Sequence, residues 1–146
     1  MKYFIYITHS HKAVLGLAFT ALVLLSGCAS KSKFLTSEVI PAARGDVQVK
    51  LDDNNNYNIQ VSIEYLAEAS RLNPPKQTYV IWMEGDHNST RNLGQVNTTS
   101  SSNKLKADFE TSSSYPPTRI FITAEEDGTV AYPGSMTVLT TGRLKG

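Results

Sequence analysis

Residues 57–65 read YNIQVSIEY, an unbroken alternation of apolar and polar side chains. Successive side chains of a strand point to opposite faces, so this pattern predicts a strand with one buried face and one solvated face. The odd-numbered positions carry the apolar side chains. We therefore expect Tyr57 and Tyr65 to pack in the core with the three β-branched residues between them, rather than to form an aromatic platform for a sugar or peptide.

Strand signals recur on both sides of this stretch, with turn-forming residues between them. Residues 78–83 (TYVIWM) are continuously apolar, as expected for a central strand that is covered on both faces. Further strands are predicted at 47–51, 92–96, 105–109, 119–124 and 135–141. We expect a single helical turn within 66–72 and a polar loop at 97–103. Residues 126–128 should form a tight hairpin turn, because Asp-Gly tolerates positive φ.

About seven strands in some 100 residues predict an all-β fold, a small immunoglobulin-like β-sandwich without a disulfide, over residues 38–146. A small closed barrel is the alternative architecture. The residues expected to be largely buried are Ile59, Val61, Ile63, Trp82, Phe109, Ile120 and Ile122.

The N-terminal segment differs in character from the rest of the chain. Lys2 and Lys12 flank an otherwise uncharged opening, and residues 13–25 (AVLGLAFTALVLL) are an apolar run of 13. A membrane-spanning helix needs about 20 apolar residues, so this run is too short for a comfortable span. It has the length of the apolar region of a secretory signal peptide, and a buried core helix is the alternative. We assign residues 1–27 to a signal peptide.

The apolar run ends in Leu25-Ser26-Gly27-Cys28, which resembles the lipobox of bacterial lipoproteins. In that class the peptidase recognises the three residues before the cysteine and cuts there. The resemblance implies that Cys28 carries a diacylglycerol thioether and an acylated amino group, palmitate being the typical chain. A buried free cysteine and a catalytic thiol are the alternatives for Cys28.

Lipidation at Cys28 would define the remaining layout of the chain. Residues 28–37 are polar, small and without period, which predicts a lipidated flexible tether before the β-domain. The protein is then expected at the cell membrane, outside the cytoplasm. Ala29 follows the cysteine, where aspartate is the usual retention signal for the inner membrane. The resemblance therefore implies the outer membrane if the host has two membranes.

Composition narrows the possible chemistry. The 146 residues include 14 basic and 13 acidic side chains, and this balance gives no electrostatic case for binding nucleic acid. One cysteine excludes an internal disulfide, an iron–sulfur cluster and any multi-cysteine zinc site. Cleavage before Cys28 would also remove His9 and His11, leaving His87 as the single histidine of the mature chain. No cofactor other than the covalent lipid is expected.

Histidine and carboxylates crowd together only at Glu84-Gly85-Asp86-His87. Glu84, Asp86 and His87 are weak candidates for a metal site, and a solvated turn is the expected structure there. No Gly-x-Ser-x-Gly elbow or comparable nucleophile motif occurs, so we predict no catalytic residue. Residues 125–127 (Glu-Glu-Asp) could offer oxygen ligands to calcium but lack the spacing of a dedicated loop, which favours an acidic hairpin tip.

These observations favour a membrane-tethered, non-enzymatic β-domain that acts by contact as a structural or interaction module. Its partner would be an envelope protein, a cell-wall polymer or a ligand, besides the membrane itself. The alternative is a small envelope hydrolase or metal-binding protein that uses His87 and nearby carboxylates.

A partial resemblance spans about residues 60–140. It rests on an apolar strand with tryptophan (79–82), Leu93-Gly94, and Ile122-Thr123-Ala124-Glu125 followed by Gly128 and Pro133. This pattern is similar to the extracytoplasmic β-domain of anti-sigma-K-type factors. Those proteins carry a cytoplasmic sigma-binding region and a transmembrane helix before the domain, and this sequence shows neither. The resemblance thus implies a β-sandwich outside the cytoplasm, and inhibition of a sigma factor is not carried over.

Overall fold

The structure is a computed structural model that describes residues 29–86, 89–101 and 104–144. Within this described part the chain forms nine strands and one short 3-10 helix, η2 (Ala69–Arg71). The strands are β1 (Ser30–Lys33), β2 (Arg44–Leu51), β3 (Tyr57–Leu66), β4 (Thr78–Glu84), β5 (Thr90–Val96), β6 (Thr99–Ser101), β7 (Lys104–Ser113), β8 (Arg119–Glu125) and β9 (Thr137–Thr140).

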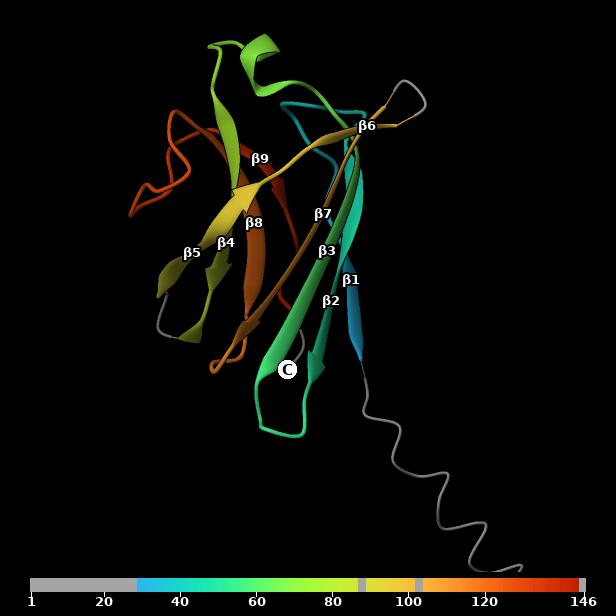
Figure 1. Cartoon of the computed structure of the whole chain (residues 1–146), viewed down its shortest axis with the longest axis vertical. Coiled ribbons are helices and arrows are strands. Elements are labelled where there is room, and N and C mark those ends of the chain that lie inside the picture. Colours follow the sequence, from blue (N-terminus) through green and yellow to red (C-terminus); the bar gives the residue numbers. More distant parts are fainter. Residues whose placement is uncertain (1–28, 87–88, 102–103, 145–146) are drawn as a thin grey trace, which may run out of the picture.

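The strands make two antiparallel sheets that pack face to face (Figure 1). The first sheet has the order β1-β2-β3-β7-β6 and the second has the order β5-β4-β8-β9. Apart from β1, the order in which the chain passes from one sheet to the other is that of an immunoglobulin-type Greek key. One extra strand, β5, lies beside β4. The predicted β-sandwich is confirmed. A closed barrel is excluded, because each sheet keeps two edge strands of its own.

The main core lies between the sheets. The inward positions of β3 alternate as predicted, and Ile59, Val61 and Ile63 are buried, as are Ile120 and Ile122 on the facing sheet. Phe109 of β7, which was expected to be largely buried, is only half-buried and packs against the margin of this core. Its ring lies over Gly94, where an added Cβ would come within 3.1 Å of it.

A second, smaller core lies on the other face of the β5-β4-β8-β9 sheet. Trp82 is fully buried as predicted, yet it packs with Val80 and Phe121 on the face turned away from the main core. Its ring stacks on that of Phe121 with a centroid separation of 6.3 Å. The connection between β8 and β9 carries Val130 onto this cluster. The prediction that β4 is covered on both faces is therefore confirmed.

The long β8–β9 connection shows that the predicted tight hairpin turn at 126–128 is wrong. β8 ends at Glu125 and β9 begins at Thr137, so residues 126–128 do not form a tight two-residue turn. Instead the loop is tied down over the sheet: the Asn92 side chain donates to the carbonyls of Gly128 and Val130, and the Gly134 amide donates to the Glu125 carboxylate at 2.7 Å. A local Asp-Gly signal could not reveal these long-range bonds.

The predicted tether at 28–37 is also wrong from Ser30 onward. Residues 30–33 form β1, which pairs antiparallel with β2, and the Phe34 side chain is buried at its end. The strand is held by backbone pairing and by an ion pair between Lys31 and Asp46 at 3.1 Å. Such an edge strand needs no apolar period, which is why the polar sequence SKSK did not reveal it. β6 lies within the predicted loop 97–103 for the same reason.

Candidate functional site

The lipidation site predicted from sequence lies outside the described residues. Leu25, Ser26, Gly27 and Cys28 all belong to the segment of which nothing structural is described. His87 is likewise outside it, whereas its neighbours Glu84 and Asp86 are described. On the C-terminal side of the predicted lipobox, the described chain enters β1 at Ser30.

Glu84 is engaged in an ion pair at the end of β4. The Arg119 guanidinium donates through Nε to one carboxylate oxygen at 2.9 Å and through Nη2 to the other. Asp86 is exposed, and its backbone carbonyl accepts a hydrogen bond from the Ser89 hydroxyl at 3.1 Å. Glu84 would have to leave a bidentate partner before it could bind a metal.

The carboxylates of residues 125–127 each bind different partners. Glu125 is buried against Thr123 and the Gly134 amide, and Glu126 pairs with Lys76 at 2.8 Å. Asp127 accepts bonds from the Thr129 amide and hydroxyl, which lower the pKa of its carboxyl. The three carboxylates therefore do not converge on a calcium site. Over residues 29–86, 89–101 and 104–144, no group of three His, Cys, Asp or Glu side chains could hold a metal ion.

Sequence reasoning missed a charged cluster on the outer face of the β1-β2-β3-β7-β6 sheet, which we call the Glu64 cluster: Arg44, Glu64, Tyr65, Lys104 and Lys106. Three cations surround the Glu64 carboxylate, with Lys106 Nζ at 2.9 Å, Lys104 Nζ at 3.2 Å and Arg44 Nη2 at 3.8 Å. Hydrogen bonds from Lys106 and Lys104 lower the pKa of the Glu64 carboxyl, and the Glu64 charge raises the pKa of Lys106.

Tyr65 joins this cluster because of a β-bulge. The pairing of β3 with β7 shifts between Glu64 and Leu66, and Tyr65 takes a φ of 60°. The shift sends Leu66 into the core and turns Tyr65 outward with 36% of its surface exposed, so the predicted burial of Tyr65 is wrong. Tyr57 at the other end of β3 is half-buried. Bulges re-aim side chains in this way, and a period-2 pattern cannot reveal one.

The exposed Tyr65 ring is flanked by two of the cations. The Arg44 guanidinium carbon lies 4.4 Å from the ring centroid and Lys104 Nζ lies 4.9 Å from it, both within cation–π range. A non-glycine residue in the left-handed region is costly unless its surroundings hold it there, and such residues gather at functional sites. The bulge therefore marks the Glu64 cluster as the best candidate recognition site in the described part of the chain.

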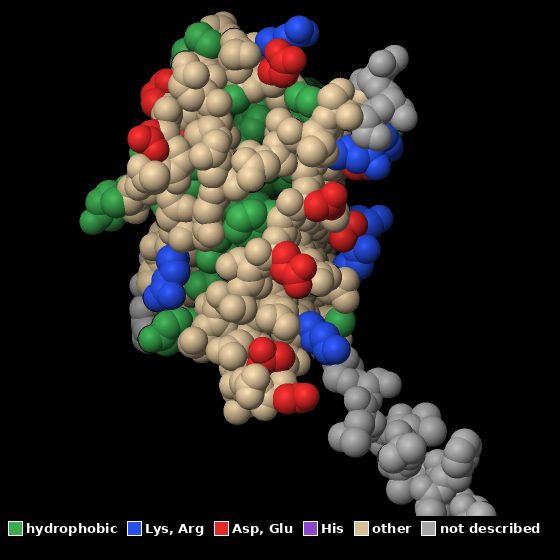
Figure 2. Space-filling model, viewed as in Figure 1, with side chains coloured by type: hydrophobic (Ala, Val, Ile, Leu, Met, Phe, Trp, Pro, Cys, Tyr) green, Lys and Arg blue, Asp and Glu red, His purple; other side chains and the backbone are tan. Residues whose placement is uncertain are grey.

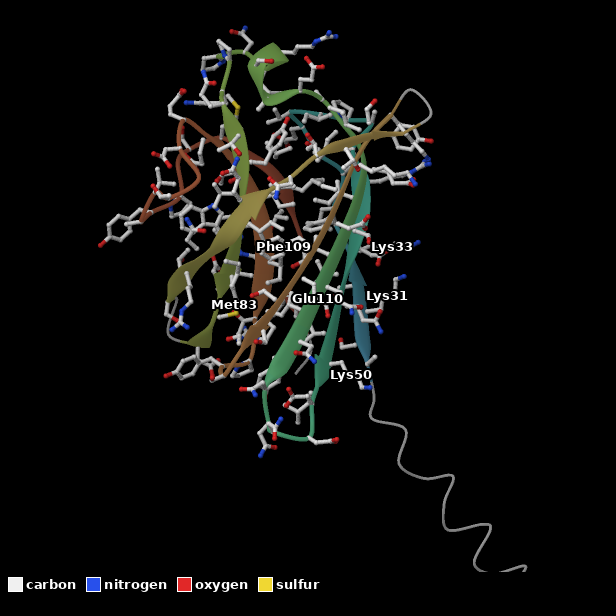
Figure 3. All side chains as sticks on the ribbon, in the orientation of Figure 1. Lys31, Lys33, Lys50, Met83, Phe109 and Glu110 are labelled. Atoms are coloured by element: carbon white, nitrogen blue, oxygen red, sulfur yellow. The ribbon has the colours of Figure 1, made fainter. Side chains whose placement is uncertain are left out.

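A depression of about 410 Å³ adjoins the Glu64 cluster on the same face. It is lined by Lys33, Arg44, Asp46, Ser62, Glu64, Lys106 and Asp108, among others. Figure 2 shows blue and red side chains interspersed along the side of the molecule where β1, β2, β3 and β7 lie, and Figure 3 shows Lys31 and Lys33 pointing outward there. This surface offers charge and hydrogen bonds, which suits recognition of a polar or charged partner.

Comparison of the chain with protein-family models, with curated proteins and with solved structures finds no match in any of the three. The resemblances to lipoproteins and to anti-sigma-K-type factors therefore stay predictions from sequence. Among the residues that the structure describes, no helix is long and apolar enough to cross a membrane.

Proposed function

We propose that the protein is a membrane-anchored envelope lipoprotein whose β-sandwich acts by contact and not by catalysis. The observation that carries the proposal is one coincidence in the sequence. An apolar run of 13 residues leads directly into Leu25-Ser26-Gly27-Cys28, and this is the only cysteine in the chain. The diacylglycerol and acyl chains expected on Cys28 would hold the domain to the bilayer, since two or more chains give stable anchoring.

The Glu64 cluster supports a contact role for the domain. It combines an exposed aromatic ring with three cations and a carboxylate on a solvated sheet face, the mixture that favours charged or polar partners. We propose that this face contacts an envelope protein, a cell-wall polymer or a ligand. In a host with two membranes we propose the outer one, because Ala29 and not aspartate follows Cys28.

The alternative is a small hydrolase or metal-binding protein that uses His87 and its neighbouring carboxylates. It would require Glu84 to exchange Arg119 for a metal ion, which removes two charge-assisted hydrogen bonds. Metal content distinguishes the two proposals: stoichiometric metal that disappears in His87→Ala would favour the alternative.

Membrane fractionation tests the anchored state. Wild-type protein should be found with membranes and migrate as a processed chain, whereas Cys28→Ser should accumulate as the longer precursor. Identical migration of the two proteins would overturn the proposal of lipidation.

Affinity capture from solubilised membranes tests the contact role. The double variant Lys104→Ala/Lys106→Ala should lose the captured partner. Lys76→Ala should retain it, because Lys76 also pairs with a glutamate, Glu126, but lies outside the Glu64 cluster. Equal capture by both variants would overturn the assignment of the contact surface.

A further inference from the structure

The anchor point is held close to the folded domain. β1 begins at Ser30, and Ala29 is the single residue between Cys28 and that strand. Two residues of extended chain reach at most about 7 Å. Lipid on Cys28 would therefore insert next to the edge of the β1-β2-β3-β7-β6 sheet, and the sandwich could not stand away from the bilayer.

The register of the strands shows which end of the sandwich this anchor meets. Ser30 pairs with Val49 near the end of β2, and Leu51 pairs with Tyr57 across the β2–β3 turn. Tyr57 pairs in turn with Ser113, so the β7–β8 connection lies at the same end. We call this the anchor-proximal end; it comprises the described residues of 50–57, 84–91, 113–119 and 141–144. Figure 1 shows the β2–β3 turn and the β7–β8 connection at the end where β1 begins.

The anchor-proximal end carries side chains that suit a lipid headgroup layer. Leu51 is 48% exposed and Tyr115 is 58% exposed. The Arg91 guanidinium lies 5.3 Å from the centroid of the Tyr115 ring. Tyrosine and arginine side chains are favoured at the interface between an apolar and an aqueous phase, because each combines an apolar body with a polar tip.

The charges at the anchor-proximal end are mixed in sign. Lys50 and Arg143 are exposed there, but so are Asp53 and Asp86. The Asp52 carboxylate is engaged with the amides of Asn54 and Asn56, each at 2.8 Å. A surface of balanced charge suits a zwitterionic headgroup and does not require anionic lipid.

The Glu64 cluster lies at the opposite end of the same strands. Glu64 pairs with Lys106 and with Arg44, at the far end of β3 from Tyr57. Seven residue steps along a strand from Tyr57 to Glu64 span roughly 23 Å at about 3.3 Å per residue. A domain that rests on its anchor-proximal end would present this cluster away from the membrane.

We propose, resting on the proposed lipidation of Cys28, that the sandwich stands end-on upon the bilayer. Its anchor-proximal end contacts the phospholipid headgroups through Leu51 and Tyr115, and the Glu64 cluster faces away from the lipid toward its partner. Side-on docking of the lysine-bearing face of β1, β2, β3 and β7 is the competing geometry.

Single cysteines at three exposed positions separate these geometries: Asn54→Cys at the β2–β3 turn, Gln60→Cys in the middle of the outer face of β3, and Ser70→Cys in η2 at the distal end. The lipidated proteins, expressed from the full-length sequence and purified from membranes, are labelled with a thiol-reactive fluorophore. They are then placed in phosphatidylcholine vesicles with a nitroxide on the headgroup. We expect loss of fluorescence at position 54 and none at 60 or 70, with no change when anionic lipid is added. Equal loss at all three positions, or the greatest loss at 60, would overturn the end-on geometry.

The protein without an added cysteine separates the two proposals. If Cys28 is a thioether, this protein takes up no dye, because the chain has no other cysteine. Dye uptake together with failure to bind vesicles would overturn the proposed lipidation itself. No dye uptake combined with quenching at position 60 would overturn the orientation alone.

Discussion

Truncation of Trp82 should destabilise the protein strongly, although this residue lies outside the core between the sheets. Its side chain is fully buried in the small cluster under the β8–β9 connection. The indole Nε1 donates to the Thr123 hydroxyl at 2.7 Å, and that hydroxyl donates to the buried Glu125 carboxylate. Glu125 in turn accepts the Gly134 amide, so removal of the indole disturbs the attachment of the loop as well as the packing.

Two substitutions separate the contribution of Trp82 packing to stability from that of its hydrogen bond. Trp82→Ala should lower the free energy of unfolding by about 3–5 kcal/mol, the range for removing a large buried aromatic side chain. Trp82→Phe keeps an aromatic ring beside Phe121 but removes the indole N–H donor. It should cost about 1–3 kcal/mol, because the buried Thr123 oxygen loses a hydrogen-bond partner.

Urea unfolding followed by far-UV circular dichroism measures both values on the mature chain carrying Cys28→Ser. Circular dichroism is required because Trp82 is the only tryptophan. Tyr132→Ala is the matched control: this ring lies in the same connection but is 84% exposed, and its loss should change stability by at most about 0.5 kcal/mol. A cost for Trp82→Ala as small as that of Tyr132→Ala would refute the second core.

Two further changes test the packing and the buried hydroxyl. Gly45→Ala should lower the free energy of unfolding in urea by at least about 1–3 kcal/mol, because its Cβ would lie 2.2 Å from the carbonyl oxygen of Ser62. The control Gly142→Ala should be neutral, because its Cβ would meet nothing within 4 Å. Equal effects of the two substitutions would contradict the close approach of β2 to β3. Burial raises the pKa of Tyr79, whose hydroxyl donates to the Ala67 carbonyl, to about 12. The folded state thus favours the neutral phenol, so this contribution to stability is complete below the ordinary tyrosine pKa and is lost as the pH rises toward about 12. The urea midpoint of Tyr79→Phe should therefore fall less at alkaline pH than that of wild type, and parallel curves would contradict the burial.

The two-sheet fold could be predicted because its central strands have strong local signals. The alternation in 57–65 and the apolar run in 78–83 became β3 and β4, and the polar residues 52–56 between β2 and β3 form a turn that closes on the Asp52 side chain. Those features depend on local pattern and turn chemistry. β1 could not be predicted in this way, because a polar edge strand is stabilised by backbone pairing to a distant partner.

The candidate recognition site was less predictable than the fold. Alternation along β3 places Glu64 on the solvated face. Nothing local indicates that Lys104 and Lys106, which are 40 and 42 residues away in the sequence, contact the same carboxylate. The register shift at Tyr65 reverses the face that its parity predicts. Both features depend on how β3 pairs with β7, which is tertiary information.

The central claim is that Cys28 is the lipid-modified first residue of the mature protein, and intact-mass spectrometry of protein purified from membranes tests it most directly. We predict a chain that starts at Cys28, carries the mass of a diacylglycerol group with or without an amide-linked acyl chain, and loses that mass in Cys28→Ser. An unmodified Cys28, or a mature chain that starts at any other residue, would contradict it.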